Sequence, residues 1–265
     1  MASNLKSAKD LVVFLGKSVI ACLESMVFTI IPKPRKNVAG EIVLITGAGS
    51  GLGRLLALRF ARLGSVLVFW DINKEGNEDT CRMAREAGAT RVYAYTCDCS
   101  QREDIYRVAE QTYKSFLPAM IANNHGHLVC ISSSAGLVGI NKLADYCASK
   151  FAALGFAESI FAETVVQKLN GIKTTIVCPF FINTGMFEGC STVRPFLLPV
   201  LEPEYVVDKI VDAILQEKVY LYVPRFISFV MFLKSILPVK VSLLVADYMG
   251  ALNIMDGFVG KNKKE

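Results

Sequence analysis

A short apolar run that ends in a glycine-rich turn constrains this chain more than any other feature. Residues 42–53 read I-V-L-I-T-G-A-G-S-G-L-G, and apolar residues at helical spacing follow from Arg54 to Leu63. Four apolar residues in a row suit a strand that is buried on both faces of a parallel sheet. Glycines at such a turn let backbone N–H groups approach a phosphate, whose charge the next helix N-terminus stabilises. The segment predicts the first strand, turn and helix of a dinucleotide-binding domain.

The residues expected to contact the phosphates form one short turn, and they are Gly47, Ser50, Gly51, Leu52 and Gly53. Their spacing is T-G-x-x-x-G-x-G, which differs from the G-x-G-x-x-G register of the larger dehydrogenases. A glycine-rich turn by itself is often only a turn. The position of this one between a strand and a helix favours a nucleotide site.

A carboxylate ends the second predicted strand, Ser65 to Asp71, 18 residues after Gly53. A carboxylate at this place can accept both ribose hydroxyls of NAD, whereas it would repel the 2′-phosphate of NADP. The following residue, Ile72, is not the Arg or Lys that a 2′-phosphate would require. Asp71 therefore predicts NAD as the cofactor, and the alternative is a solvated strand end.

Strands and helices alternate through the rest of the chain as far as Val223. Further strands are expected at residues 91–98, 127–134, 173–178 and 219–223, and helices at residues 74–87, 101–123, 145–169 and 204–216. This alternation predicts an α/β fold with a Rossmann-like, doubly wound parallel sheet. The third strand ends at Asp98, where a carboxylate is able to receive an adenine amino group.

Tyr146 and Lys150 stand four residues apart on a predicted helix and so share one face. A phenol has a pKa of about 10, and an adjacent cation is needed to bring it into proton transfer near neutral pH. Ser133 ends the preceding strand, where its hydroxyl would hold a substrate oxygen. A second Y-x-x-x-K, at Tyr205 and Lys209, follows a proline-rich loop instead of a buried strand, and we interpret it as a coincidence.

Composition and the two chain ends indicate contact with a membrane. The chain is 52% hydrophobic, and its mean hydropathy of +0.40 is high for a soluble enzyme. Leu11 to Ile31 is an apolar segment that either spans a membrane or lies in its interface, and the basic run Lys33 to Lys36 follows it. The stretch from Phe226 to Met255 is again strongly apolar, and a core helix is the alternative to a second membrane-facing element.

We therefore expect three parts: an anchor at residues 1–36, a catalytic domain at 37–225 and a membrane-facing tail at 226–265. The net charge of +5 gathers beside the apolar ends, which fits an anionic membrane surface better than a nucleic acid. Eight scattered cysteines indicate reduced thiols in a cytosol-facing domain, and no metal site is expected.

The turn, Asp71, Asp98, Ser133, Tyr146 and Lys150 together resemble the short-chain dehydrogenase/reductase family over residues 40 to about 225. Residues 32–36, 71–74 and 186–189 are similar to its membrane-bound retinol and 17β-hydroxysteroid dehydrogenase branch. The resemblance implies NAD-dependent oxidation of a lipophilic alcohol, retinol first and a 17β-hydroxysteroid next.

In the roles that the resemblance implies, Tyr146 is the general acid/base, Lys150 lowers its pKa and holds the nicotinamide ribose, and Ser133 orients the substrate oxygen. Pro179 and Thr184 match positions over the nicotinamide, although Phe180 replaces the glycine that usually follows that proline. The resemblance also implies the endoplasmic reticulum membrane, with lipid droplets as a second location, and a homo-oligomer or a full-length relative as partner. The final residues, 261–265, match a K-x-K-x-x retrieval pattern.

One part of the family pattern is missing. Family members place a further strand, ending in N-N-A-G, and most of a long helix between the Asp98 and Ser133 positions, where this chain has 34 residues. The run Asn123-Asn124-His125-Gly126 abuts the Ser133 strand, so we interpret it as a decoy. The loss predicts a sheet without its fourth strand, which leaves either a central gap or a shifted sheet. Two hypotheses follow: a working dehydrogenase, or a catalytically impaired protein that binds only membranes or a partner.

Overall fold

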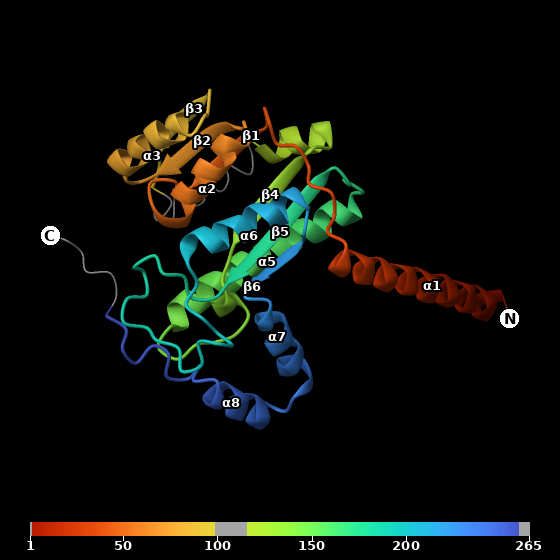
Figure 1. Cartoon of the computed structure of the whole chain (residues 1–265). Coiled ribbons are helices and arrows are strands. Elements are labelled where there is room, and N and C mark those ends of the chain that lie inside the picture. Colours follow the sequence, from red (N-terminus) through yellow and green to blue (C-terminus); the bar gives the residue numbers. More distant parts are fainter. Residues whose placement is uncertain (1, 99–115, 260–265) are drawn as a thin grey trace. The chain divides into compact units, whose positions relative to one another are not determined.

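The computed structural model describes residues 2–98 and 116–259 of the chain, which form two compact units, Met1–Lys36 and Asn37–Glu265 (Figure 1). The first unit contains helix α1 (Ala2–Ile30). Within α1, the segment Lys9–Phe28 is long and apolar enough to cross a membrane, and none of it is buried. This helix agrees with the apolar segment expected at the N-terminus.

The second unit begins with a parallel sheet of three strands in the order β1-β2-β3. Its elements in chain order are β1 (Ile42–Thr46), α2 (Gly51–Arg62), β2 (Val66–Asp71), α3 (Lys74–Glu86) and β3 (Val92–Thr96). Ile42 lies opposite Val66, and Leu67 lies opposite Val92. These five elements confirm the strands and helices expected for the first half of the domain.

A second parallel sheet of three strands has the order β4-β5-β6. Residues 116–123 are helical and lead into this half. The elements that follow are β4 (Gly126–Ile131), the 3₁₀ turn η1 (Ser134–Gly136), α5 (Ala144–Val166), β5 (Ile172–Pro179), α6 (Pro203–Leu215), β6 (Tyr220–Val223), α7 (Phe226–Ile236) and α8 (Val239–Tyr248). Of the long helix expected at residues 101–123, the part up to residue 115 lies outside the described residues.

The two sheets do not join. Among the described residues, β1 pairs only with β2 and β4 pairs only with β5, so no ladder links β1 to β4. Of the two outcomes expected from the missing strand, the structure has the central gap and not the shifted sheet. The doubly wound sheet is therefore present as two halves.

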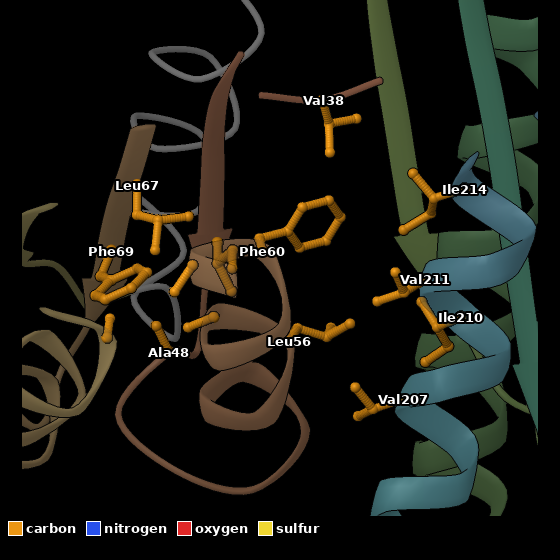
Figure 2. Packing of buried hydrophobic residues seen from close by; sticks show 14 of the residues in the cluster. Val38, Ala48, Leu56, Phe60, Leu67, Phe69, Val207, Ile210, Val211 and Ile214 are labelled. Carbon is orange, nitrogen blue, oxygen red and sulfur yellow. The ribbon is translucent and has the colours of Figure 1, made fainter. Parts of the chain in front are cut away.

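The two half-sheets are joined on one face by packing between side chains of α2 and α6. Leu56 and Phe60 on α2 point toward Val207, Ile210 and Ile214 on α6, and all five belong to one buried cluster (Figure 2). The same cluster includes buried residues of both sheets. Burial of apolar surface contributes roughly 25 cal/mol per Å², which makes this shared core the main force between the halves.

The apolar stretch after residue 226 is helical but little buried. In α7 only Ile227 is buried, and α8 has no buried residue. Pro238 lies between the two helices, where its missing N–H ends the first. The exposure of α7 and α8 favours a surface position for these two helices over the alternative of a core helix.

Candidate active site

The turn after β1 is shaped by glycines for which other residues are poor substitutes. Gly47 and Gly51 have φ values of +69° and +52°, in the left-handed region that glycine adopts without strain. Gly53 lies in the first turn of α2, and a Cβ there would sit 2.0 Å from the carbonyl oxygen of Gly47. The close packing of Gly53 on Gly47 leaves a backbone cradle at the helix N-terminus, which is suited to an anion.

Asp71 and Arg54 fix this turn from two sides. One Asp71 carboxylate oxygen accepts the Gly49 N–H at 2.8 Å, and the other accepts the Asn73 N–H at 2.8 Å. The Arg54 guanidinium donates to the Gly49 carbonyl and, at 3.1 Å, to the Gly76 carbonyl. Asp71, which was expected to bind the ribose, therefore also holds the backbone of the glycine turn in place. Arg54 is a second supporting residue, and the sequence pattern did not reveal it.

Ser133 and Tyr146 meet at the end of β4. The Ser133 hydroxyl accepts the Ala135 N–H at 3.1 Å and donates to the Pro179 carbonyl at 3.4 Å. Burial raises the pKa of the Tyr146 phenol above its ordinary value, while its hydrogen bond with Ser133 lowers that pKa by less. The phenol is therefore neutral at neutral pH.

Lys150 does not play the expected part toward Tyr146 in this structure. Its ammonium donates to the Ile131 carbonyl at 3.3 Å and lies 5.6 Å from the centre of the Tyr146 ring. Burial lowers the pKa of Lys150, and the net direction for the Tyr146 pKa is upward, not downward. The physical reason is that the Ile131 carbonyl lies on the open edge of β4 and attracts the ammonium.

One cavity of about 470 Å³ brings most of the predicted site together. Its walls include ten of the predicted residues, namely Gly47, Ser50, Gly51, Leu52, Gly53, Ser133, Tyr146, Lys150, Pro179 and Thr184. Asp71 and Asp98 do not line it; Asp71 is the last residue of β2, and Asp98 comes two residues after the end of β3. The structure thus joins the glycine turn of one half-sheet to the reactive residues of the other.

The remaining wall of the cavity is aromatic and aliphatic. Phe187 packs edge to face against Tyr146 with ring centroids 5.5 Å apart, and Phe181 packs against Phe187 at 4.9 Å. Ile254 and Met255 are buried in the same cluster and support this wall from the C-terminal segment. Sequence reasoning missed these residues, because they come from irregular segments far apart in the chain.

Both sequence decoys lie away from the cavity. Tyr205 and Lys209 are on α6, where Tyr205 is 47% exposed and neither residue lines the cavity. Asn124 has a φ of +44° and lies two residues before the start of β4, so it is at the opposite end of that strand from Ser133. Their interpretation as decoys agrees with this geometry.

The chain matches the family described as short chain dehydrogenase, over residues 41–116 and 110–193. The solved structure of a short chain dehydrogenase/reductase from Burkholderia phymatum in complex with NAD shares the fold, with a TM-score of 0.61 and 21% identity. That match covers 76% of this chain and 94% of the other.

Several named proteins are similar over almost their whole length. Epidermal retinol dehydrogenase 2 of Homo sapiens is 65% identical, with all of both chains covered. Short-chain dehydrogenase/reductase family 16C member 6 of Bos taurus is 49% identical, covering 96% of this chain and 94% of that protein. Estradiol 17-beta-dehydrogenase 11 of Homo sapiens is 40% identical, covering 88% and 91%.

These alignments also bear on the missing segment. The alignment with human epidermal retinol dehydrogenase 2 runs over 308 positions, so at least 43 of them have no residue in this chain of 265. The family match falls into two pieces that meet at residues 110–116. This chain therefore lacks, relative to the human protein, a number of residues that would make up a strand and a helix. The break in the family match lies between Asp98 and Ser133, where the sequence predicted the missing segment.

Proposed function

Because this chain belongs to the short-chain dehydrogenase family, we propose that it is a membrane-anchored, NAD-dependent oxidoreductase of a lipophilic alcohol. Retinol is the first candidate substrate and a 17β-hydroxysteroid the second. The observation that carries the proposal is the single cavity in which the glycine turn faces Ser133, Tyr146 and Lys150.

The residues beside the turn fit a dinucleotide. The backbone of Gly47, Gly51 and Gly53 would hold the pyrophosphate, since the close approach at Gly53 leaves no room for a side chain there. Asp71 would accept the ribose hydroxyls, and Asp98 the adenine amino group. A carboxylate offers about four lone-pair sites, so Asp71 keeps acceptor capacity beyond its two N–H contacts.

Bound NAD would accept the hydride, and side chains of this protein would accept or donate the proton. Ser133 would orient the substrate oxygen beside the Tyr146 hydroxyl. A neutral Tyr146 can donate a proton to a carbonyl, whereas oxidation of an alcohol requires the phenolate. Lys150 would stabilise that phenolate when its ammonium turns from Ile131 toward the phenol, with Pro179 and Thr184 beside the nicotinamide.

The cavity wall favours a lipophilic substrate. Ile140, Leu143, Phe181, Met186 and Phe187 line it on the side of Tyr146. An apolar wall of this kind binds hydrocarbon and offers few partners to a polar ligand. Similar proteins are named for retinol and for estradiol, which supports an alcohol of this class.

We also propose the location. Residues 1–36 would anchor the chain in the endoplasmic reticulum membrane, with domain 37–225 facing the cytosol and the tail 226–265 against the lipid; lipid droplets are a second location. The exposed α7 and α8 support this reading, while the pattern at residues 261–265 lies outside the described residues. A homo-oligomer or a full-length relative is the proposed protein partner.

A second candidate function is a catalytically impaired protein that binds only the membrane or a partner. The gap between β1 and β4 favours it, because in the described part of the chain it leaves backbone groups beside the cofactor turn without ladder partners. Several such groups, if buried, cost about 1–3 kcal/mol each. That sum is comparable with the ~5–15 kcal/mol that stabilises a whole domain.

Thermal unfolding with NAD separates the two functions. Ligand at 100 times its Kd adds about 2.7 kcal/mol to the stability of the folded state. We expect a rise in the melting temperature with NAD, a weaker rise with NADP, and a smaller effect of NAD on the variant Asp71→Ala. No shift at millimolar NAD would exclude the dehydrogenase proposal, and equal shifts with both nucleotides would exclude the role of Asp71.

A further inference from the structure

Among the described strands only β2 pairs with β1, so the edge of β1 that faces away from β2 has no ladder partner there. At the two ends of β1, Glu41 accepts a ladder bond from β2 at 2.9 Å and Gly47 donates one to β2 at 2.8 Å. In a parallel ladder alternate residues bond to the same neighbour. The N–H and C=O groups that point away from β2 therefore belong to Ile42, Leu44 and Thr46.

Within the described part of the chain, β4 likewise has no second strand beside it on the side that faces away from β5. Gly126 and Ser132 donate to β5 at 3.2 and 2.9 Å, so the even-numbered residues of β4 serve the β4–β5 ladder. The groups of Val129 and Ile131 point to the other side. The Ile131 carbonyl accepts Lys150 there, which indicates that a side chain substitutes for a strand partner.

The two open edges belong to one body and run in matching directions. The α2–α6 core joins their halves, and Glu41 and His125, which directly precede β1 and β4, contact each other at 3.1 Å. Neighbouring strands lie about 4.8 Å apart, so one strand between β1 and β4 needs a gap of about 10 Å. Ile42 is 65% exposed, which is unusual for a central strand of a parallel sheet.

We propose that the open edges of β1 and β4 together bind one extended apolar segment of another polypeptide, lying parallel to both strands. The segment is five or six residues long, to match β1 and β4, and apolar on both faces. Its alternate N–H and C=O groups bond to β1 on one side and to β4 on the other. The occupant takes the place of the strand that the family pattern leads us to expect between β3 and β4, and at least 43 aligned positions of human epidermal retinol dehydrogenase 2 have no residue in this chain.

The occupied gap has a consequence for the cavity next to it. A strand partner for the Ile131 carbonyl competes with the Lys150 ammonium, which then becomes available to Tyr146. The C-terminal end of the gap lies between the glycine turn and Ser133, so the added strand would complete the cavity wall. Binding of the segment itself does not depend on the proposed function, because the backbone edges alone define it.

The test uses the full chain in detergent and a synthetic peptide that covers the extra positions of human epidermal retinol dehydrogenase 2. Hydrogen exchange is measured by NMR with and without the peptide. The amides of Ile42, Leu44 and Val129 should exchange at least about tenfold more slowly with the peptide, because they gain acceptors. The amides of Val43 and Ile45 already bond to β2 and should change little.

Two controls make the outcome specific. A peptide with N-methyl groups on alternate residues of its apolar run should bind at least about tenfold more weakly in fluorescence anisotropy, since it cannot donate to one edge. The complete human relative, which has its own segment, should not bind the peptide. Equal binding of both peptides, equal binding by the complete relative, or unchanged exchange at Ile42, Leu44 and Val129 would each overturn the proposal.

Discussion

Replacement of Gly53 by alanine sets two effects of opposite sign against each other. In a helix interior Gly→Ala stabilises a protein by up to about 1 kcal/mol, because glycine is the more flexible residue. At residue 53, however, the new Cβ would lie 2.0 Å from the Gly47 carbonyl oxygen and 2.7 Å from its carbon. Those atoms must separate by about 1 Å, and neither belongs to a flexible side chain.

We expect the steric clash with Gly47 to outweigh the gain in helix stability. Overpacking of this kind costs roughly 1–3 kcal/mol, and for a chain of this size each kcal/mol lowers the melting temperature by about 2–4 °C. Gly53→Ala should therefore melt roughly 2–12 °C lower than the parent and should lose the thermal shift with NAD. Far-UV circular dichroism during heating measures the first effect, and the same experiment with millimolar NAD measures the second.

Gly155→Ala is the matched control. Gly155 is exposed on α5, and a Cβ there would meet no heavy atom within 4 Å. This variant should be as stable as the parent or more stable by up to about 1 kcal/mol. If Gly53→Ala were stabilised like Gly155→Ala and still bound NAD, the close packing of α2 on the Gly47 turn would be refuted.

Microsomes that carry this chain should oxidise little or no retinol with NAD, because a misplacement of about 1 Å costs about 100-fold in rate and a central strand is absent. Insertion of the absent segment from a complete relative should restore turnover and Tyr146→Phe should abolish it again; robust Tyr146-dependent turnover by the unaltered chain would contradict this. The pKa of Lys150 is lowered in the folded state, so the stability that its neutral form confers is present above the unfolded pKa of about 10.4 and is lost as pH falls through the folded pKa. Urea titrations should therefore show the parent chain gaining stability toward alkaline pH relative to Lys150→Met, and parallel profiles would exclude a buried ammonium. Deletion of residues 1–36 should move part of the protein to the soluble fraction, whereas complete retention would mean that residues 226–255 suffice. Lys261→Ser with Lys263→Ser should alter localisation if the terminal pattern acts, and unchanged localisation would dismiss it.

The order of strands and helices could be predicted from the sequence, because short-range patterns of apolar residues and glycines determine it. The apolar run before Gly47 and the helical period after Gly53 specify β1, its turn and α2 without reference to distant residues. The convergence of Ser133, Tyr146 and Lys150 on the same cavity was also predictable, since strand ends and helix faces meet at one edge of a parallel sheet.

The orientation of Lys150 could not be read from the sequence. Its hydrogen bond to Ile131 depends on which edge of β4 lacks a neighbour, and only the pairing of whole strands decides that. The contact of Phe187 with Tyr146 and the burial of Met255 are similar cases. They arise from irregular segments whose path no periodicity describes.

The core between α2 and α6 also joins the two walls of the cavity. The glycine turn sits on one half-sheet and Tyr146 on the helix that covers the other, while no backbone ladder among the described strands ties the two halves. The packing of Leu56 and Phe60 against Val207 and Ile210 is thus the contact about which the two halves would rotate (Figure 2). A small rotation at this contact would change the distance between the glycine turn and the Tyr146 phenol, which line the same cavity.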